Sequence, residues 1–152
     1  GAVAFKQEIY DTFMDTGGQD YMLEIPHGYT YSAHPIACAA GLASLGEIKK
    51  QGLIERVNNM SSAWENSVHQ LKSASSMITD IRNYGFAAGI TIAPIGNEPA
   101  KRPFQIAMAM WDKGYYVRYG ADTIQLAPPF TTEQSEIDSL INALGETIRQ
   151  QS

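Results

Sequence analysis

The chain has 152 residues, of which 44% are hydrophobic and 18% are charged, values typical of a soluble globular protein with a sizeable core. Its formal net charge of -5 argues against a nucleic-acid or anionic-membrane partner, because phosphate backbones and acidic lipids repel such a surface. No apolar run reaches the length of a membrane span, and the N-terminal residues lack the basic start and apolar core of a signal peptide. The single cysteine, Cys38, rules out an internal disulfide, so we predict a cytoplasmic protein.

The first 50 residues are predicted to form one short strand and two helices. The run Gly1–Phe5 has the apolar character of a buried strand. Apolar residues recur at helical spacing within Lys6–Met14, which predicts a short helix there. A helix rich in alanine, glycine and serine is expected from about residue 33 to residue 50, because Pro35 fits a first helical turn and two lysines complement the negative end.

The next segment is predicted to be a long helix followed by a hinge. Between Leu53 and Leu71, apolar residues follow one another at intervals of three or four along a single stripe, which is typical of a helix that packs on a core. Ser73–Ser76 consists of small residues and has the composition of a hinge between two lobes. We therefore divide the chain into residues 1–72 and residues 73–152.

The second lobe is predicted to alternate short strands with helices in the order ββαββα, as a sheet layered against helices. The capping box of the last helix is expected at Thr131 and Gln134. The preceding helix, which stops at Gly114, carries one apolar face made by Phe104, Ala107, Met108 and Trp111. The expected strands are Met77–Arg82, residues 86–92, Tyr115–Tyr119 and Thr123–Ala127, with the last two joined as a hairpin.

The stretch His27–Pro35 contains the first candidate site. Either Ser32 or His34 can cap the helix that follows, and both choices bring neighbouring hydroxyl groups to the positive end of that helix. Such an arrangement can bind an anion, phosphate above all. The alternative is that the hydroxyl groups only satisfy the backbone of their own helix. Only His34 and Cys38 have a spacing suited to a shared metal, and without a second pair we predict no metal site.

The amino-acid sequence of this stretch resembles a signature of the class III aminotransferases. It reads His27-Gly-Tyr-Thr-Tyr-Ser-Ala-His-Pro35 and is followed by an alanine-rich helix. These are pyridoxal-phosphate (PLP) enzymes of fold type I, and the omega-amino acid (β-alanine):pyruvate branch looks closest. The resemblance implies that Thr30 binds the cofactor phosphate across a homodimer interface and that Tyr29 lies at the same phosphate. It also implies an α/β fold, with residues 1–72 ending the large PLP-binding domain and residues 73–152 forming the small α+β domain.

Two later stretches extend the resemblance. Asp80-Ile-Arg-Asn-Tyr-Gly-Phe86 resembles an internal motif of the family, with Asn83 where the family has its first glycine. Val117-Arg-Tyr-Gly-Ala-Asp-Thr-Ile-Gln-Leu-Ala-Pro-Pro129 resembles the C-terminal signature, whose arginine binds the substrate α-carboxylate. This role implies Arg118 as the substrate-binding residue. Judged by local chemistry alone, Arg118 is either a surface arginine or a two-pronged carboxylate ligand.

The resemblance covers the whole chain but only the C-terminal part of a family member. The lysine that forms the Schiff base in the family would precede Gly1, and Lys6, at an exposed helix start, has the features of a surface lysine. The activity that the resemblance implies for the family is amino transfer from an omega-amino acid or amine to pyruvate. We expect this chain to be catalytically inactive by itself, because it has no catalytic residue of its own.

Two alternatives to this hypothesis stay open at this point. One is a non-catalytic interaction module derived from the small domain, and the other is a carboxylate-sensing domain that uses Arg118. Under these alternatives and under the aminotransferase hypothesis alike, we expect self-association, which would cover either the Leu53–Leu71 stripe or the alanine-rich helix.

Overall fold

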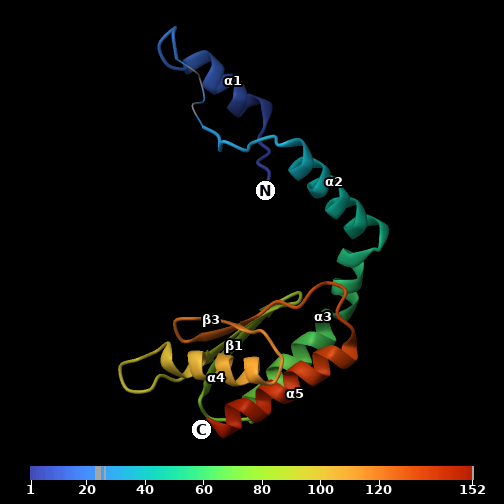
Figure 1. The fold of residues 1–152 in the computed structure, drawn as a ribbon, viewed down its shortest axis with the longest axis vertical. Coiled ribbons are helices and arrows are strands. Elements are labelled where there is room, and N and C mark those ends of the chain that lie inside the picture. Colours follow the sequence, from blue (N-terminus) through green and yellow to red (C-terminus); the bar gives the residue numbers. More distant parts are fainter. Residues whose placement is uncertain (23–24, 26, 152) are drawn as a thin grey trace. The chain divides into compact units, whose positions relative to one another are not determined.

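The computed structural model describes residues 1–22, 25 and 27–151, and these form two compact units, Gly1–Ile48 and Lys49–Ser152 (Figure 1). Helix α3 (Leu53–Gln70), which precedes the expected hinge, belongs to the second unit, because its apolar stripe shares a core with the sheet. The division at residues 72 and 73 refers to the two domains that the family resemblance implies, and it stays a prediction.

The first unit contains the predicted helix α1 (Gln7–Thr16) and all but the last two residues of the predicted helix α2 (Pro35–Lys50). The strand expected over Gly1–Phe5 is wrong: these residues form no regular element. A strand needs a hydrogen-bonded neighbour, and the described part of this unit offers none.

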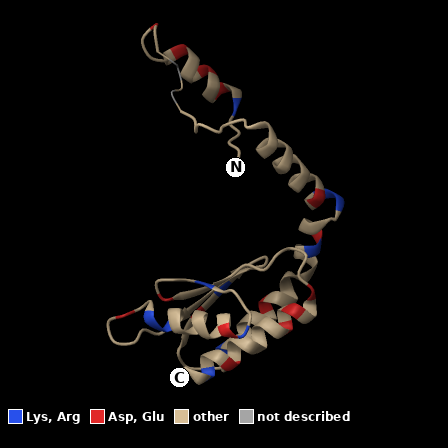
Figure 2. Ribbon diagram, in the orientation of Figure 1, with Lys and Arg blue, Asp and Glu red and all other residues tan. Residues whose placement is uncertain are grey.

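Helix α2 has no buried residue and no charged residue before Glu47, so most of its ribbon is tan in Figure 2. Its larger apolar side chains, Ile36, Leu42 and Leu45, are exposed. A helix gains most of its stability from packing an apolar face. Among the described residues of the first unit, none buries these apolar side chains of α2.

The second unit has the predicted ββαββα order after α3. Its sheet has the order β1-β2-β4-β3, and every neighbouring pair is antiparallel. A single 3-10 turn, Leu71–Ser73, links α3 to the sheet. The remaining elements are β1 (Ile78–Tyr84), β2 (Ala87–Ile92), α4 (Lys101–Asp112), β3 (Arg118–Gly120), β4 (Thr123–Leu126) and α5 (Gln134–Gln150).

Helices α3 and α4 pack against one face of this sheet, and α5 packs against both helices and completes the core (Figure 1). Because side chains alternate across a strand, Ile90 and Ile92 of β2 and Ile124 and Leu126 of β4 point into one core. Trp64, near the middle of α3, packs into the same core and is fully buried. The opposite face of the sheet is polar and open.

The register of the strands defines the open face. Arg82 of β1 pairs with Gly89 of β2, Gly89 pairs with Gln125 of β4, and Gln125 pairs with Arg118 of β3. Directly opposed residues lie on the same face of a sheet. These four residues therefore form one row across the open face.

Helix α4 has two apolar stripes, and only one of them is buried. The core stripe is Pro103, Ile106, Ala107 and Met110. The apolar face singled out from the sequence shares Ala107 with this stripe, but its members Phe104, Met108 and Trp111 are exposed. Both stripes have helical spacing of three and four, so periodicity alone does not choose between them.

The capping box of the last helix lies two residues beyond the predicted position. Glu133 is the N-cap of α5, and its backbone N–H donates to Glu136 Oε2 at 2.8 Å. The expected box at Thr131 and Gln134 is therefore wrong. A glutamate at position N3 can reach back to the N-cap, and the pair Glu133–Glu136 has the same three-residue spacing as the predicted pair.

Leu144 of α5 is fully buried, whereas Leu45 of α2 is exposed, and the same substitution at the two positions separates core packing from helix propensity. Leu144→Ala should lower the free energy of unfolding by about 3 kcal/mol, because it removes buried methyl groups and leaves a cavity. Leu45→Ala should change it by less than about 0.5 kcal/mol. Urea denaturation followed by tryptophan fluorescence measures both values, and equal values would contradict the assigned core.

Candidate functional site

A hydrogen-bonded turn in the first unit carries Tyr29 and Thr30. The Ser32 N–H donates to the Tyr29 carbonyl at 2.9 Å, and the Tyr29 N–H donates to Ser32 Oγ at 3.0 Å. Ala33, the next residue, has a left-handed backbone with φ of 58°. This conformation is costly for a residue with a Cβ atom, and it turns the chain into helix α2.

The structure decides between the two candidate cap residues of α2. The helix begins at Pro35, and the residue directly before it is His34, whose carbonyl accepts the Cys38 N–H at 3.0 Å. The Ser32 hydroxyl is hydrogen-bonded inside the preceding turn instead. The rings of Tyr31 and His34 stack with their centroids 5.6 Å apart.

The turn offers the chemistry that a phosphate group needs. Tyr29 and Thr30 are both exposed, and their hydroxyl groups can donate to an anion from outside. They lie just before the N-terminus of the 16-residue helix α2, where unpaired N–H groups and the helix dipole favour negative charge. These donors fit the phosphate of PLP.

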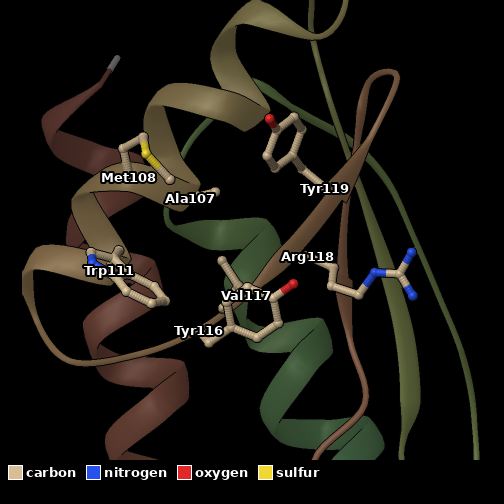
Figure 3. A pocket seen from close by; sticks show the side chains of 7 residues that line it. All are labelled: Ala107, Met108, Trp111, Tyr116, Val117, Arg118 and Tyr119. Carbon is tan, nitrogen blue, oxygen red and sulfur yellow. The ribbon is translucent and has the colours of Figure 1, made fainter.

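Arg118 begins the edge strand β3 of the second unit. Val117 before it is buried in the core, and the ring of Tyr119 after it lies 5.8 Å from that of Phe104 on α4. The Arg118 side chain extends away from Trp111 and Tyr116 (Figure 3). Among the described residues no hydrogen bond or ion pair engages its guanidinium. The group is therefore available to a ligand.

Arg118 borders two open pockets of this unit. One, of about 260 Å³, lies beside Trp111 and Tyr116, whose rings meet edge to face (Figure 3). The other, of about 520 Å³, lies between the ends of β3 and β4 and the start of α5. Its wall includes Gln125, Pro128, Pro129, Thr132 and Glu136. A guanidinium beside a wall of this kind can hold a small carboxylate through two parallel hydrogen bonds.

Gln125 is a polar neighbour of Arg118 that sequence reasoning missed. The two residues are direct partners across β3 and β4. A Cβ atom added to Gly120 would lie only 2.9 Å from Gln125 Nε2. The absence of a side chain at Gly120 therefore leaves room for the Gln125 carboxamide against β3. The signal was present in the sequence, because Gln125 is the single polar residue between the apolar Ile124 and Leu126.

The three residues predicted for the sites thus fall into the two units. Tyr29 and Thr30 share one turn in the first unit, and Arg118 lies at the pocket edge of the second. Over the described ranges no group of three or more metal-binding side chains occurs. None of the helices in the described part of the chain has the length and apolar character to cross a membrane.

Comparison with known proteins gives a match to nearly the whole chain. The family described as aminotransferase class III matches residues 1–148. Omega-amino acid–pyruvate aminotransferase of Pseudomonas putida is 46% identical over 97% of this chain and 33% of its own length. Beta-alanine–pyruvate aminotransferase of Pseudomonas aeruginosa is 45% identical over the same shares. The chain therefore spans about a third of the length of the curated relatives it matches.

Solved structures agree with this match. The adenosylmethionine-8-amino-7-oxononanoate aminotransferase of Methanocaldococcus jannaschii has a TM-score of 0.81 at 28% identity, over 94% of this chain and 33% of that chain. A PLP-bound amine transaminase from an uncultivated Pseudomonas species has a TM-score of 0.82 at 28% identity, over 96% and 34%. These similarities confirm the predicted α/β fold of the type I PLP-dependent transferases.

Because the Arg118 guanidinium has no partner among the described residues and is exposed, its removal should leave folding nearly unchanged. Arg118→Ala should alter the free energy of unfolding by less than about 0.5 kcal/mol, as at other surface positions. Val117→Ala, at the buried neighbour, should cost more than 1 kcal/mol, on the order of other core truncations. Parallel urea titrations compare the two, and a large loss for Arg118→Ala would assign that residue a structural role.

Proposed function

Because the chain belongs to the class III aminotransferases, we propose that it forms the C-terminal third of an enzyme that moves an amino group from an omega-amino acid, such as β-alanine, to pyruvate. The observation that supports this proposal is the sequence identity between almost the whole chain and two relatives named for this reaction. No finding favours the non-catalytic alternatives. The proposal includes a cytoplasmic location, since one cysteine allows no internal disulfide.

Pyridoxal phosphate is the cofactor of the family, and related solved structures are described in PLP-bound and PMP-bound forms. When bound, it acts as an electron sink that carries the amino group between donor and acceptor. We assign Thr30 and Tyr29 to its phosphate, which their hydroxyl groups would hold at the start of α2. By resemblance to the family, that phosphate belongs to the site of a partner subunit, so a homodimer is part of the proposal.

Arg118 is assigned to the substrate carboxylate. Its exposed, unpaired guanidinium and the pocket beside it support this role. A planar guanidinium holds a carboxylate in a fixed orientation through two N–H donors. Arg118 would therefore orient pyruvate and the carboxylate of the amino donor.

Lys6 does not supply the group for the proton transfers of the reaction. The family's lysine has no counterpart at Lys6, which is exposed and precedes α1. A catalytic lysine needs burial or a neighbouring cation to lower its pKa. We therefore propose that residues 1–152 bind and orient but do not catalyse amino transfer by themselves.

A chimeric enzyme tests the proposal directly. Residues 1–148 would replace the matching third of the Pseudomonas putida relative, and transfer from β-alanine to pyruvate would be measured with PLP present. We expect activity, a raised KM for pyruvate in Arg118→Lys and a raised PLP requirement in Thr30→Ala. A folded, PLP-loaded chimera that uses other amino acceptors but not pyruvate would refute the proposed substrate.

The 152-residue chain alone should bind PLP poorly. After mixing with PLP and reduction with borohydride, peptide mass spectrometry should find scattered labelling below one equivalent, because exposed lysines react without a specific site. Thr30→Ala should leave that pattern unchanged. One stoichiometric adduct on a single lysine, blocked by phosphate and lost in Thr30→Ala, would show that a complete cofactor site exists. The proposal that the chain alone is catalytically inactive would then be wrong.

Self-association should use the exposed apolar side chains of α2. The Leu53–Leu71 stripe, the other surface expected to drive it, is largely buried in the core of the second unit. Sedimentation velocity should show a concentration-dependent dimer or larger species, and Leu42→Glu should shift it toward monomer. Tyr84→Glu, at an exposed residue of the other unit, should not. A wild-type monomer at high concentration would contradict the prediction.

A further inference from the structure

Arg56 connects the first turn of α3 to the segment that links β4 to α5. Its Nε donates to the Phe130 carbonyl at 3.1 Å, and its Nη2 donates to the Thr132 carbonyl at 2.8 Å. The same Nη2 lies 3.1 Å from Glu133 Oε1. One side chain thus contacts three positions of the segment Phe130–Glu133.

This segment continues directly from the wall of the Arg118 pocket. The pocket is lined in chain order by Gln125, Pro128, Pro129 and Thr132, and then by Glu136 on α5. The Thr132 N–H donates to the Pro129 carbonyl at 3.0 Å, which closes a turn between the prolines and α5. Arg56 holds the two carbonyls at the end of this turn, on either side of Thr131.

The contacts of Arg56 are not those of an ordinary surface ion pair. Only 29% of its side chain is exposed, against 69% for Glu133. Exposed pairs contribute little, because water screens them and side-chain entropy opposes them. Two charge-assisted hydrogen bonds to backbone carbonyls are stronger than neutral ones and depend on the planar guanidinium.

We propose that Arg56 is a positioning residue for carboxylate binding, which fixes the Pro128–Thr132 wall against which a small monocarboxylate lies on Arg118. This inference rests on the proposed role of Arg118. Without Arg56, the turn loses its tie to α3 and the pocket samples open arrangements. A ligand then binds only the fraction of molecules with an ordered wall, and its apparent affinity falls by that fraction.

The test uses the 152-residue chain and pyruvate as the probe. Pyruvate binding is measured by NMR titration of the arginine Nε–Hε signals, and the order of residues 127–133 is measured by hydrogen exchange. The variants are Arg56→Ala, Arg56→Lys and Glu133→Gln, with Arg118→Lys as the test of the carboxylate ligand. Arg102→Ala is the matched control, because Arg102 Nη1 also donates to two backbone carbonyls, those of Ala93 and Pro94, outside the pocket.

We expect Arg56→Ala to speed exchange in residues 127–133 and to raise the Kd for pyruvate about tenfold, the effect of leaving about one molecule in ten with an ordered wall. Arg56→Lys should be intermediate, because one ammonium group cannot reproduce the planar fork. Glu133→Gln should resemble wild type, since both carbonyl contacts stay. Arg102→Ala should destabilise the fold without changing the Kd.

Two results would overturn the inference, and they differ from each other. If Arg118→Lys weakens pyruvate binding but Arg56→Ala does not, or if Arg102→Ala weakens it equally, Arg56 has no positioning role while the role of Arg118 stands. If wild type and Arg118→Lys behave alike, including no binding by either, the carboxylate role of Arg118 fails. The role of Arg56 as its positioning residue then fails with it.

Discussion

Burial of one face of a four-stranded antiparallel sheet is the constraint on which the second unit depends. Helices α3 and α4 pack on that face, α5 packs on both helices, and the strands alternate apolar side chains into the shared core. Because Val117 must point into the core, Arg118 must point to the open face. The register then sets Arg118 opposite Gln125. The direction of the Arg118 side chain is thus set by packing in which that side chain takes no part.

The same constraint is absent from the first unit. Its two helices have no buried residue, and the apolar side chains of α2 lie exposed beside an almost uncharged surface. The Tyr29–Thr30 turn is well defined by its own hydrogen bonds. The chain, which spans about a third of its relatives' length, thus contains two different units. One has its own hydrophobic core, and the other has an apolar helix that buries no residue.

Element types followed closely from local patterns, whereas faces and caps did not. The core stripe of α3 was predictable because all its large apolar residues except the exposed Ile54 share one side. Helix α4 was not, because exposed Phe104, Met108 and Trp111 have the same spacing as the residues that pack. The cap of α5 was misplaced because two pairs with capping-box spacing overlap in Thr131–Glu136, and the geometry of the turn selects the second. The strand expected at Gly1–Phe5 had an apolar run but no partner to pair with.

The sequence by itself determined the family resemblance, the ββαββα order and the identity of Tyr29, Thr30 and Arg118 as site candidates, since motifs and periodicity are local properties of the chain. Tertiary structure alone decided that α3 belongs with the sheet, that Gln125 lies beside Arg118, and that Arg56 bonds a segment more than 70 residues away. The first and third relations depend on contacts between distant parts of the chain, and the second depends on the register of the β3–β4 hairpin. No spacing in the sequence encodes such contacts, because they arise only when one face of the sheet is buried.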